Sequence, residues 1–234
     1  MNETKCPYHN SKMRPDLPPP PERMRGLPIG KNGYPIPFFV AEVNGSREDF
    51  RIADADKKRC CIKTRSCWVC GQPLGRYVSF VIGPMCSINR LSADPPTHLE
   101  CAEYSVKACP FLLRPAMVRR EDDLSEEMSR NVGGVMLKRN PGVMAIWTTV
   151  SYKVEISNRD ALFRLAAPES ITWWREGRPA TRAEVLASIE SGYPLLVDVC
   201  RSPRELAKLE GDRKEAMVLL PEGGEVSQER KFEK

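Results

Sequence analysis

Two short pairs of side chains carry the clearest chemistry in this sequence. Cys67 and Cys70 are separated by two residues, and Gly71 follows at once. Thiolates at this spacing can face one ion, and the glycine allows the tight turn that points backbone N–H groups at sulfur. His98 and Cys101 form a second pair with the same spacing. Together the two pairs predict a Cys₃His zinc site.

The second pair is expected at the start of a helix. The Pro95–Pro96 dipeptide blocks an earlier helix, and Thr97 and Glu100 have the spacing of a capping box. A helix from Thr97 would place His98 and Cys101 on one face, where the positive helix end favours the Cys101 thiolate. A knuckle, a hairpin and a helix that supplies the second ligand pair form the order of a treble-clef zinc module.

Two further cysteines are reserve ligands. Cys86 follows the Gly83–Pro84 turn and could replace His98. Cys109 lies eight residues after Cys101, about 12 Å along a helix, which is too far for the same ion. Cys109 is therefore expected in the core. Four filled ligand positions predict a structural zinc, because a hydrolytic zinc keeps one position open for water.

Composition indicates a soluble, cytoplasmic chain. It has 234 residues with nine cysteines, and 41% of its residues are apolar. No apolar run approaches the roughly 20 residues that cross a bilayer, and the first thirty residues lack a secretion signal. Thiols stay reduced in the cytoplasm, so the cysteines are interpreted as metal ligands and buried side chains rather than disulfides.

The shortage of histidine argues against catalysis. The only histidines are His9 and His98. A treble-clef nuclease of the HNH type needs a general-base histidine in addition to its metal ligands, and a cysteine nucleophile also needs a base. With His98 committed to zinc, a nuclease is the least favoured function. A non-catalytic protein that binds a macromolecule is favoured.

A basic region around the knuckle gives an alternative function. Residues 1–120 hold 19 basic against 11 acidic side chains, and residues 121–234 hold 17 against 20. A zinc-dependent nucleic-acid module could grip phosphates with the basic side chains while Trp68 stacks on a base. Its candidate cations are Lys57, Lys58, Arg59, Lys63, Arg65 and Arg76. The competing interpretation is a solvated edge in which Trp68 covers the zinc site.

A second candidate surface follows further along the chain. Arginines beside tryptophan can make cation–π contacts with a protein partner, which makes Trp174, Arg175 and Arg178 candidates. If this segment is a strand, Trp173 and Trp174 point to opposite faces, one inward and one outward. The competing interpretation is a core tryptophan followed by a turn.

The predicted fold class is α+β, with a small zinc module joined to a domain of strands and a helical hairpin. Residues 1–37 form a proline-rich arm, 38–118 the zinc module, 119–222 the α+β domain and 223–234 a frayed tail. Strands are expected at 38–43, returning at 49–52 after the Asn44–Gly45 turn, and at 77–82, 143–156, 161–165 and 171–174. Helices are expected from Thr181 to a stop at Gly192, and from Ser202.

These motifs resemble a family of uncharacterised phage and bacterial proteins. The resemblance lies in the Cys67-x-x-Cys70-Gly71 knuckle, the Pro95–Cys101 segment, the Cys109–Leu112 segment and the Trp174–Glu184 segment, and it spans about residues 65–220. It implies that the two ligand pairs recur while the Cys86 position varies. It implies no activity, but a phage setting would make a host protein the expected partner.

Overall fold

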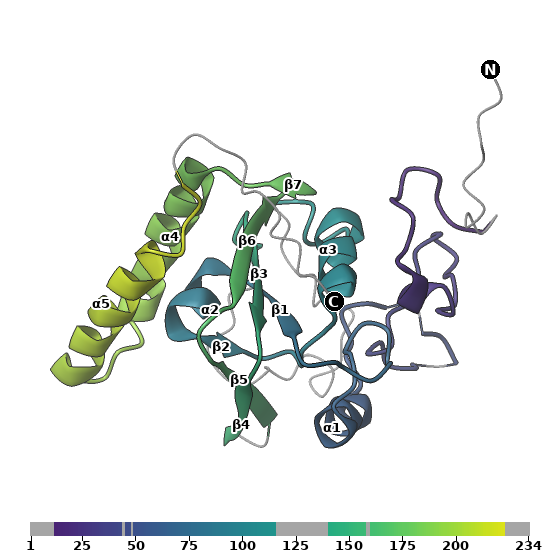
Figure 1. Cartoon of the computed structure of the whole chain (residues 1–234), viewed down its shortest axis with the longest axis horizontal. Coiled ribbons are helices and arrows are strands. Elements are labelled where there is room, and N and C mark those ends of the chain that lie inside the picture. Colours follow the sequence, from purple (N-terminus) through teal and green to yellow (C-terminus); the bar gives the residue numbers. More distant parts are fainter. Residues whose placement is uncertain (1–11, 44, 48, 116–139, 158–159, 223–234) are drawn as a thin grey trace.

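The computed structural model describes residues 12–43, 45–47, 49–115, 140–157 and 160–222. Within these ranges the chain forms two antiparallel sheets and five α-helices (Figure 1). This mixed composition agrees with the predicted α+β class. The helices are α1 (Ala55–Thr64), α2 (Pro84–Asn89), α3 (Leu99–Ala108), α4 (Arg182–Val197) and α5 (Pro203–Met217), with a short 3-10 helix η1 (Glu22–Met24).

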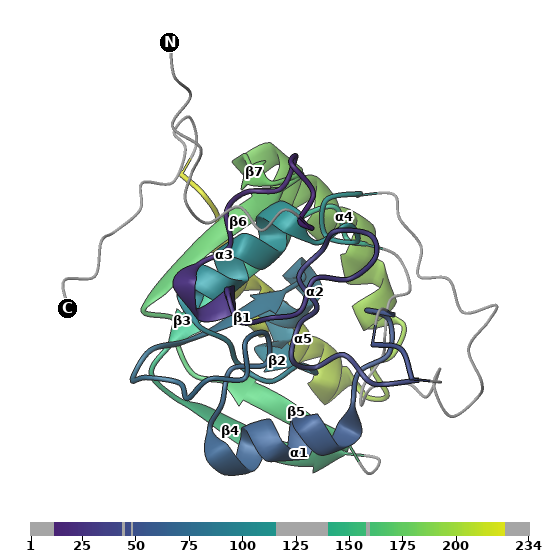
Figure 2. The ribbon, with the colours of Figure 1, turned by 90° about the vertical axis from the view of Figure 1, so that its right-hand side faces the viewer.

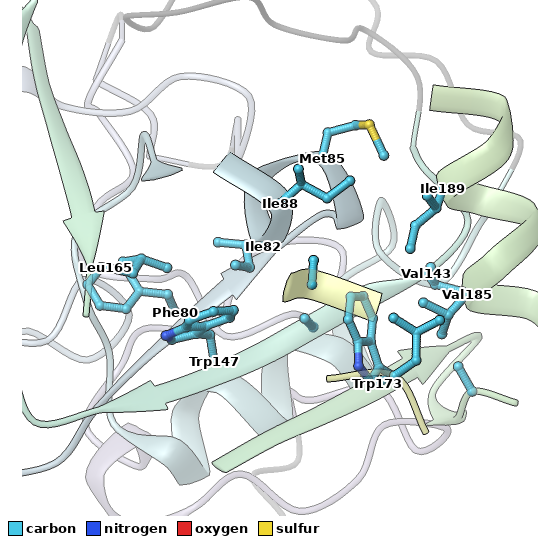
Figure 3. Packing of buried hydrophobic residues seen from close by; sticks show 14 of the residues in the cluster. Phe80, Ile82, Met85, Ile88, Val143, Trp147, Leu165, Trp173, Val185 and Ile189 are labelled. Atoms are coloured by element: carbon cyan, nitrogen blue, oxygen red, sulfur yellow. The ribbon is translucent and has the colours of Figure 1, made fainter. Parts of the chain in front are cut away.

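The larger sheet forms the centre of the molecule. Its strand order is β1 (Val78–Ile82), β3 (Met144–Thr149), β6 (Ser170–Arg175) and β7 (Arg178–Pro179). Successive side chains alternate between its two faces. One face packs against α2, α4 and α5, as Figure 3 shows for Trp173 beside Val185 and Ile189. The other face packs against α3 through Ile146 and Trp174. The sheet is therefore buried on both faces.

Because both faces of the sheet are covered, both tryptophans of the Trp173–Trp174 pair are buried. Trp173 is 2% exposed and Trp174 is 9% exposed, and they lie in different apolar clusters. The prediction that they point to opposite faces is confirmed, but the prediction that one points outward is wrong. The reason is that α3 covers the second face, which strand periodicity alone does not reveal.

The smaller sheet has the order β2 (Leu91–Ser92), β5 (Asp160–Leu165) and β4 (Tyr152–Ser157). The single strand predicted for 143–156 is wrong, because this segment forms β3 and β4 in different sheets. The apolar alternation also shifts, from odd positions such as Trp147 to even positions such as Tyr152. A one-residue shift moves apolar side chains to the opposite face, so a continuous strand could not bury both sets.

The two C-terminal helices begin where the sequence predicts. Thr181 and Glu184 form the predicted capping box, and the Ser202 side chain caps α5. The predicted stop at Gly192 is wrong, because α4 continues to Val197. Gly192 lies against α2, where a Cβ would stand 3.0 Å from the sulfur of Met85. A Cβ here would press on the Met85 side chain, so the glycine allows α4 to approach α2 closely.

Other local differences lie before the larger sheet. Residues 38–52 form isolated bridges instead of regular strands, although Val43 and Ser46 exchange backbone hydrogen bonds of 2.8 and 2.9 Å across the predicted turn. Helices α1 and α2 were not predicted. Their signals are local: the Asp54 side chain caps α1, and Pro84 occupies the first turn of α2.

Both sheets contain strands from each side of the predicted boundary at residues 118–119. That boundary lies in 116–139, outside the described residues. β1 pairs with β3 in the larger sheet, and β2 pairs with β5 in the smaller sheet. Within the described residues, the segments on either side of the boundary therefore share their sheets and their main apolar cluster.

Candidate metal centre

The two predicted ligand pairs meet in the structure. The ligand atoms of Cys67, Cys70, His98 and Cys101 all lie within 4.8 Å of one another. The Nδ1 atom of His98 is 3.4 Å from the sulfur of Cys70 and 3.9 Å from the sulfur of Cys101. Neighbouring ligands of a tetrahedral zinc stand roughly 3.5–3.8 Å apart, given the usual Zn–S and Zn–N bond lengths. The cluster could therefore hold a metal ion.

The knuckle turn positions the first pair. The backbone N–H of Cys70 donates to the sulfur of Cys67 at 3.4 Å, and the N–H of Cys67 donates to the carbonyl of Gln72 at 2.8 Å. Gly71 has a φ of +76°, and a Cβ at this position would stand 2.8 Å from the ring of Phe38. Backbone conformation and packing both require glycine here, as the sequence pattern indicates.

Helix α3 positions the second pair, although it begins one residue later than predicted. His98 is its N-cap, and the predicted Thr97–Glu100 capping box is wrong. The Thr97 hydroxyl donates instead to the carbonyl of His98 at 2.9 Å. Thr97 and Ser79 of β1 exchange two backbone hydrogen bonds of 2.8 Å. The central sheet therefore fixes the residue that precedes His98.

The outer nitrogen of the imidazole has its own partner. Nε2 of His98 lies 3.0 Å from the carbonyl oxygen of Pro73. Because a carbonyl can only accept, Nε2 carries the proton and donates, which leaves Nδ1 free to ligate a metal. This contact has no signal in the sequence, because its acceptor is a backbone group.

Without a cation, hydrogen bonds among the four groups shift the pKa values of His98, Cys67 and Cys101. Burial disfavours the imidazolium of His98, but hydrogen bonds to the sulfurs of Cys67 and Cys70 outweigh it and raise the pKa of His98 to about 10. Hydrogen bonds from Cys101 and Cys70 lower the pKa of Cys67, and the bond donated to Cys67 raises the pKa of Cys101. A divalent cation bound by all four groups would replace these protons.

The chain between the two pairs differs from the predicted hairpin. It forms β1, α2 and β2, and the two strands belong to different sheets and do not pair with each other. The hairpin prediction is therefore wrong. A knuckle followed later by a helix that carries the second pair is present, but the treble-clef arrangement itself is not confirmed.

The proline-rich arm covers the cluster. Met24, at the end of η1, is 2% exposed and packs in one apolar cluster with Cys67, Cys101 and Tyr104. Figure 2 shows η1 and the purple segment beside it lying against α3. The described part of the arm, residues 12–37, therefore forms part of the surroundings of the site.

Polar contacts also attach the arm to both ligand pairs. Arg23 binds Glu100 in the first turn of α3 at 2.7 Å, and its carbonyl accepts from the Gln72 amide beside the knuckle at 3.1 Å. Arg23 was not predicted as part of the site, because the sequence pattern assigns Glu100 to the helix cap. No spacing rule connects two residues that are 77 positions apart.

The two reserve cysteines do not join the cluster. Cys86 lies in α2 beside the main apolar cluster, and burial raises the pKa of its thiol to about 11. Cys109 is the C-cap of α3, at the opposite end of the helix from Cys101. Burial also raises the pKa of the Cys109 thiol.

Several side chains of the basic region have partners within the chain. Lys57 donates to the carbonyl of Val40 at 2.6 Å, and Lys58 pairs with Asp160 at 2.7 Å. Trp68 is 5% exposed and stacks on Phe39 with ring centres 5.2 Å apart. Its ring is therefore not open for stacking on a base.

The remaining cations of this region are exposed. Arg59 pairs with Asp56, Arg65 donates to the carbonyl of Gly75 at 3.3 Å, and Arg76 lies over the ring of Tyr77. Lys63 is exposed near the end of α1. These contacts are with solvent-facing groups, so the four side chains form the accessible part of the predicted basic surface.

The side chains of the second candidate surface also contact other residues of the chain. Trp174 lies under Lys107 of α3, whose ammonium is 4.8 Å from a ring centre. Arg175 and Arg178 both pair with Glu184, at 3.3 and 2.6 Å. The hydrogen bond from Arg178 lowers the pKa of Glu184 to about 2. These residues join β6 and β7 to the start of α4.

Comparison with known proteins gives no relative for this chain: no family model, no curated protein and no solved structure matches it. The resemblance to phage and bacterial proteins therefore rests on its motifs alone. The other histidine, His9, lies outside the described residues. In the part of the chain that is described, no helix has both the length and the apolar character to cross a membrane.

Proposed function

We propose that this chain is a non-catalytic zinc protein, with one structural ion held by Cys67, Cys70, His98 and Cys101. The convergence of these four side chains carries the proposal. Three thiolates and one imidazole suit zinc, which prefers sulfur and nitrogen ligands in tetrahedral geometry. Four protein ligands fill the coordination shell and leave no position for a reacting water.

The surroundings of the cluster support a structural role. The knuckle, α3 and the arm contribute its apolar neighbours, and the three segments pack together around these ligands. An ion at this point would join three parts of the chain that are distant in sequence. The nuclease alternative is not supported, because His98 belongs to the cluster and donates its outer N–H to Pro73.

Zinc content tests this proposal directly. The purified chain is expected to contain one zinc ion per molecule by elemental analysis, and a strong chelator is expected to lower its melting temperature and its far-UV circular dichroism. A metal-free chain with the same melting temperature before and after chelation would contradict a structural ion. Readdition of zinc to the chelated chain serves as the control for reversibility.

For the partner, we propose a protein rather than a nucleic acid. Trp68, Lys57 and Lys58 have the internal partners described above, which reduces the surface available for phosphates and bases. The setting that we propose is the cytoplasm, because the eight cysteines among the described residues are all free. Under the phage resemblance, the partner would be a host protein.

The nucleic-acid alternative makes a measurable prediction of its own. Contacts with phosphates release counterions, so the affinity would fall steeply as salt is raised. We expect fluorescence anisotropy with single- and double-stranded oligonucleotides to show no salt-dependent binding at micromolar protein. Salt-dependent binding that is lost in Lys63→Glu and Arg76→Glu would favour the alternative.

Affinity capture from a host lysate, with and without nuclease, would then separate direct protein partners from partners bridged by nucleic acid.

A further inference from the structure

The edge of the smaller sheet carries an unused set of backbone groups. β4 is the last strand in the order β2-β5-β4, and no described strand pairs with its other side. The N–H of Leu165 in β5 points toward β2, where it donates to the carbonyl of Arg90. Leu165 lies opposite Tyr152 of β4, so this pair exchanges no backbone hydrogen bonds between the two strands. Because bonding alternates along antiparallel strands, Tyr152, Val154 and Ile156 direct their N–H and C=O groups to the free edge.

The same three residues form an apolar row on one face of β4. Tyr152 packs against Phe80 and Phe163 of the core. Toward the other end of the strand the row leaves the core, so Val154 is 39% exposed and Ile156 is 76% exposed. An exposed apolar edge strand is a template for pairing with another strand.

The opposite face of β4 carries opposite charges two residues apart. Lys153 lies directly across from Arg164 of β5, a like-charge pair. Glu155 offsets part of this repulsion, because its carboxylate accepts a hydrogen bond from the Arg164 guanidinium at 2.5 Å. A second carboxylate beside Lys153 would balance this row of charges.

We propose that β4 pairs with β4 of a second copy of this chain, antiparallel and centred on Val154. In this register Lys153 lies opposite Glu155 of the other copy, and Glu155 lies opposite its Lys153. Tyr152 lies opposite Ile156 of the other copy on the apolar face. The free backbone groups of the three apolar residues all find partners, and the two smaller sheets join into one.

Other registers lose at least one of these matches. A shift by one residue would place apolar and charged side chains on the same face, because the side-chain period of a strand is two. A register centred on Glu155 would place the two Glu155 carboxylates directly opposite each other, a like-charge pair. Parallel pairing would place each charge beside its own copy. The sequence of β4 is self-complementary only around Val154.

Charge exchange tests the register. The native chain is expected to form a dimer in sedimentation velocity, with a dimer fraction that rises with concentration because one strand edge makes a small interface. Lys153→Glu and Glu155→Lys each create two like-charge pairs and are expected to weaken dimerisation roughly tenfold. An equal mixture of the two variants restores both opposite-charge pairs, so it is expected to form a heterodimer of nearly native strength.

Controls separate this interface from general effects. Lys63→Glu makes the same charge change on exposed α1 and is expected to leave the dimer intact. Val154→Pro removes a donor that faces the free edge, so the chain is expected to stay folded and monomeric. If Glu155→Lys does not fold, the double variant K153E/E155K keeps both cross-pairs and decides the question by dimerising. A native chain that stays monomeric, or variants that do not recover on mixing, overturn the proposal.

Discussion

The Cys101→Ser chain is expected to lose its zinc and a large part of its stability. Structural zinc sites in small modules bind with apparent free energies of about 10–16 kcal/mol near neutral pH, and that energy is coupled to folding. The loss here should be smaller than this figure, because the main apolar cluster lies on the other face of the central sheet from α3. We expect several kcal/mol, measured as a lower melting temperature and a zinc content near zero.

A matched substitution on the same helix controls for the loss of a thiol. Cys109→Ser makes the same chemical change at the other end of α3, outside the cluster. It is expected to keep one zinc ion per chain and to change stability by about 1 kcal/mol. Cys86→Ser tests the remaining reserve ligand and is also expected to keep zinc. If Cys109→Ser or Cys86→Ser releases zinc while Cys101→Ser does not, the ligand set is different from the one proposed.

The stability loss in Cys101→Ser should spread to the arm. Met24 packs beside the ligand sulfurs, and Arg23 connects Glu100 of α3 to the knuckle through Gln72. Hydrogen exchange should therefore increase in the arm, in the knuckle and in the first turn of α3, and less in β3 and α4. The metal, the arm and α3 form one cooperative unit in this interpretation.

The ligand cluster was predictable because its information is local. Each pair is fixed by a spacing of two residues, and a knuckle glycine or a helix start determines its geometry. Only the meeting of the two pairs required the fold. The pairing of Arg23 with Glu100, by contrast, joins residues that have no relation in the sequence.

Three of the errors share one physical cause, which is that burial depends on distant elements. Gly192 resembles a helix stop, but it lies within α4 where this helix approaches Met85 of α2. The 143–156 segment resembles one strand until the two sheets that bury its halves are known. One tryptophan of the Trp173–Trp174 pair is expected to point outward from strand periodicity, because nothing in the strand itself shows that α3 covers the second face.

The two tryptophans of β6 should both be costly to remove. Trp173 is buried against α4, and its indole N–H donates to the carbonyl of Leu219 at 2.9 Å. Trp174 is buried against α3, and its N–H donates to the hydroxyl of Thr172 at 2.9 Å. Replacing a buried tryptophan by alanine typically costs 3–5 kcal/mol through lost burial and a residual cavity. We expect about this loss for Trp173→Ala and slightly less for Trp174→Ala, measured by urea denaturation at fixed zinc concentration.

The comparison between the two variants decides whether α3 covers the sheet as described. An outward-facing Trp174 would cost no more than about 0.5 kcal/mol, which is the usual range for exposed positions. Val218→Ala, at a position that is 83% exposed and outside β4, provides that reference in the same chain. Trp174 also supports the helix that carries Cys101, so Trp174→Ala should speed the release of zinc to a chelator under conditions where the chain stays folded. Trp173→Ala lies on the other face of the sheet and should speed that release only through global unfolding.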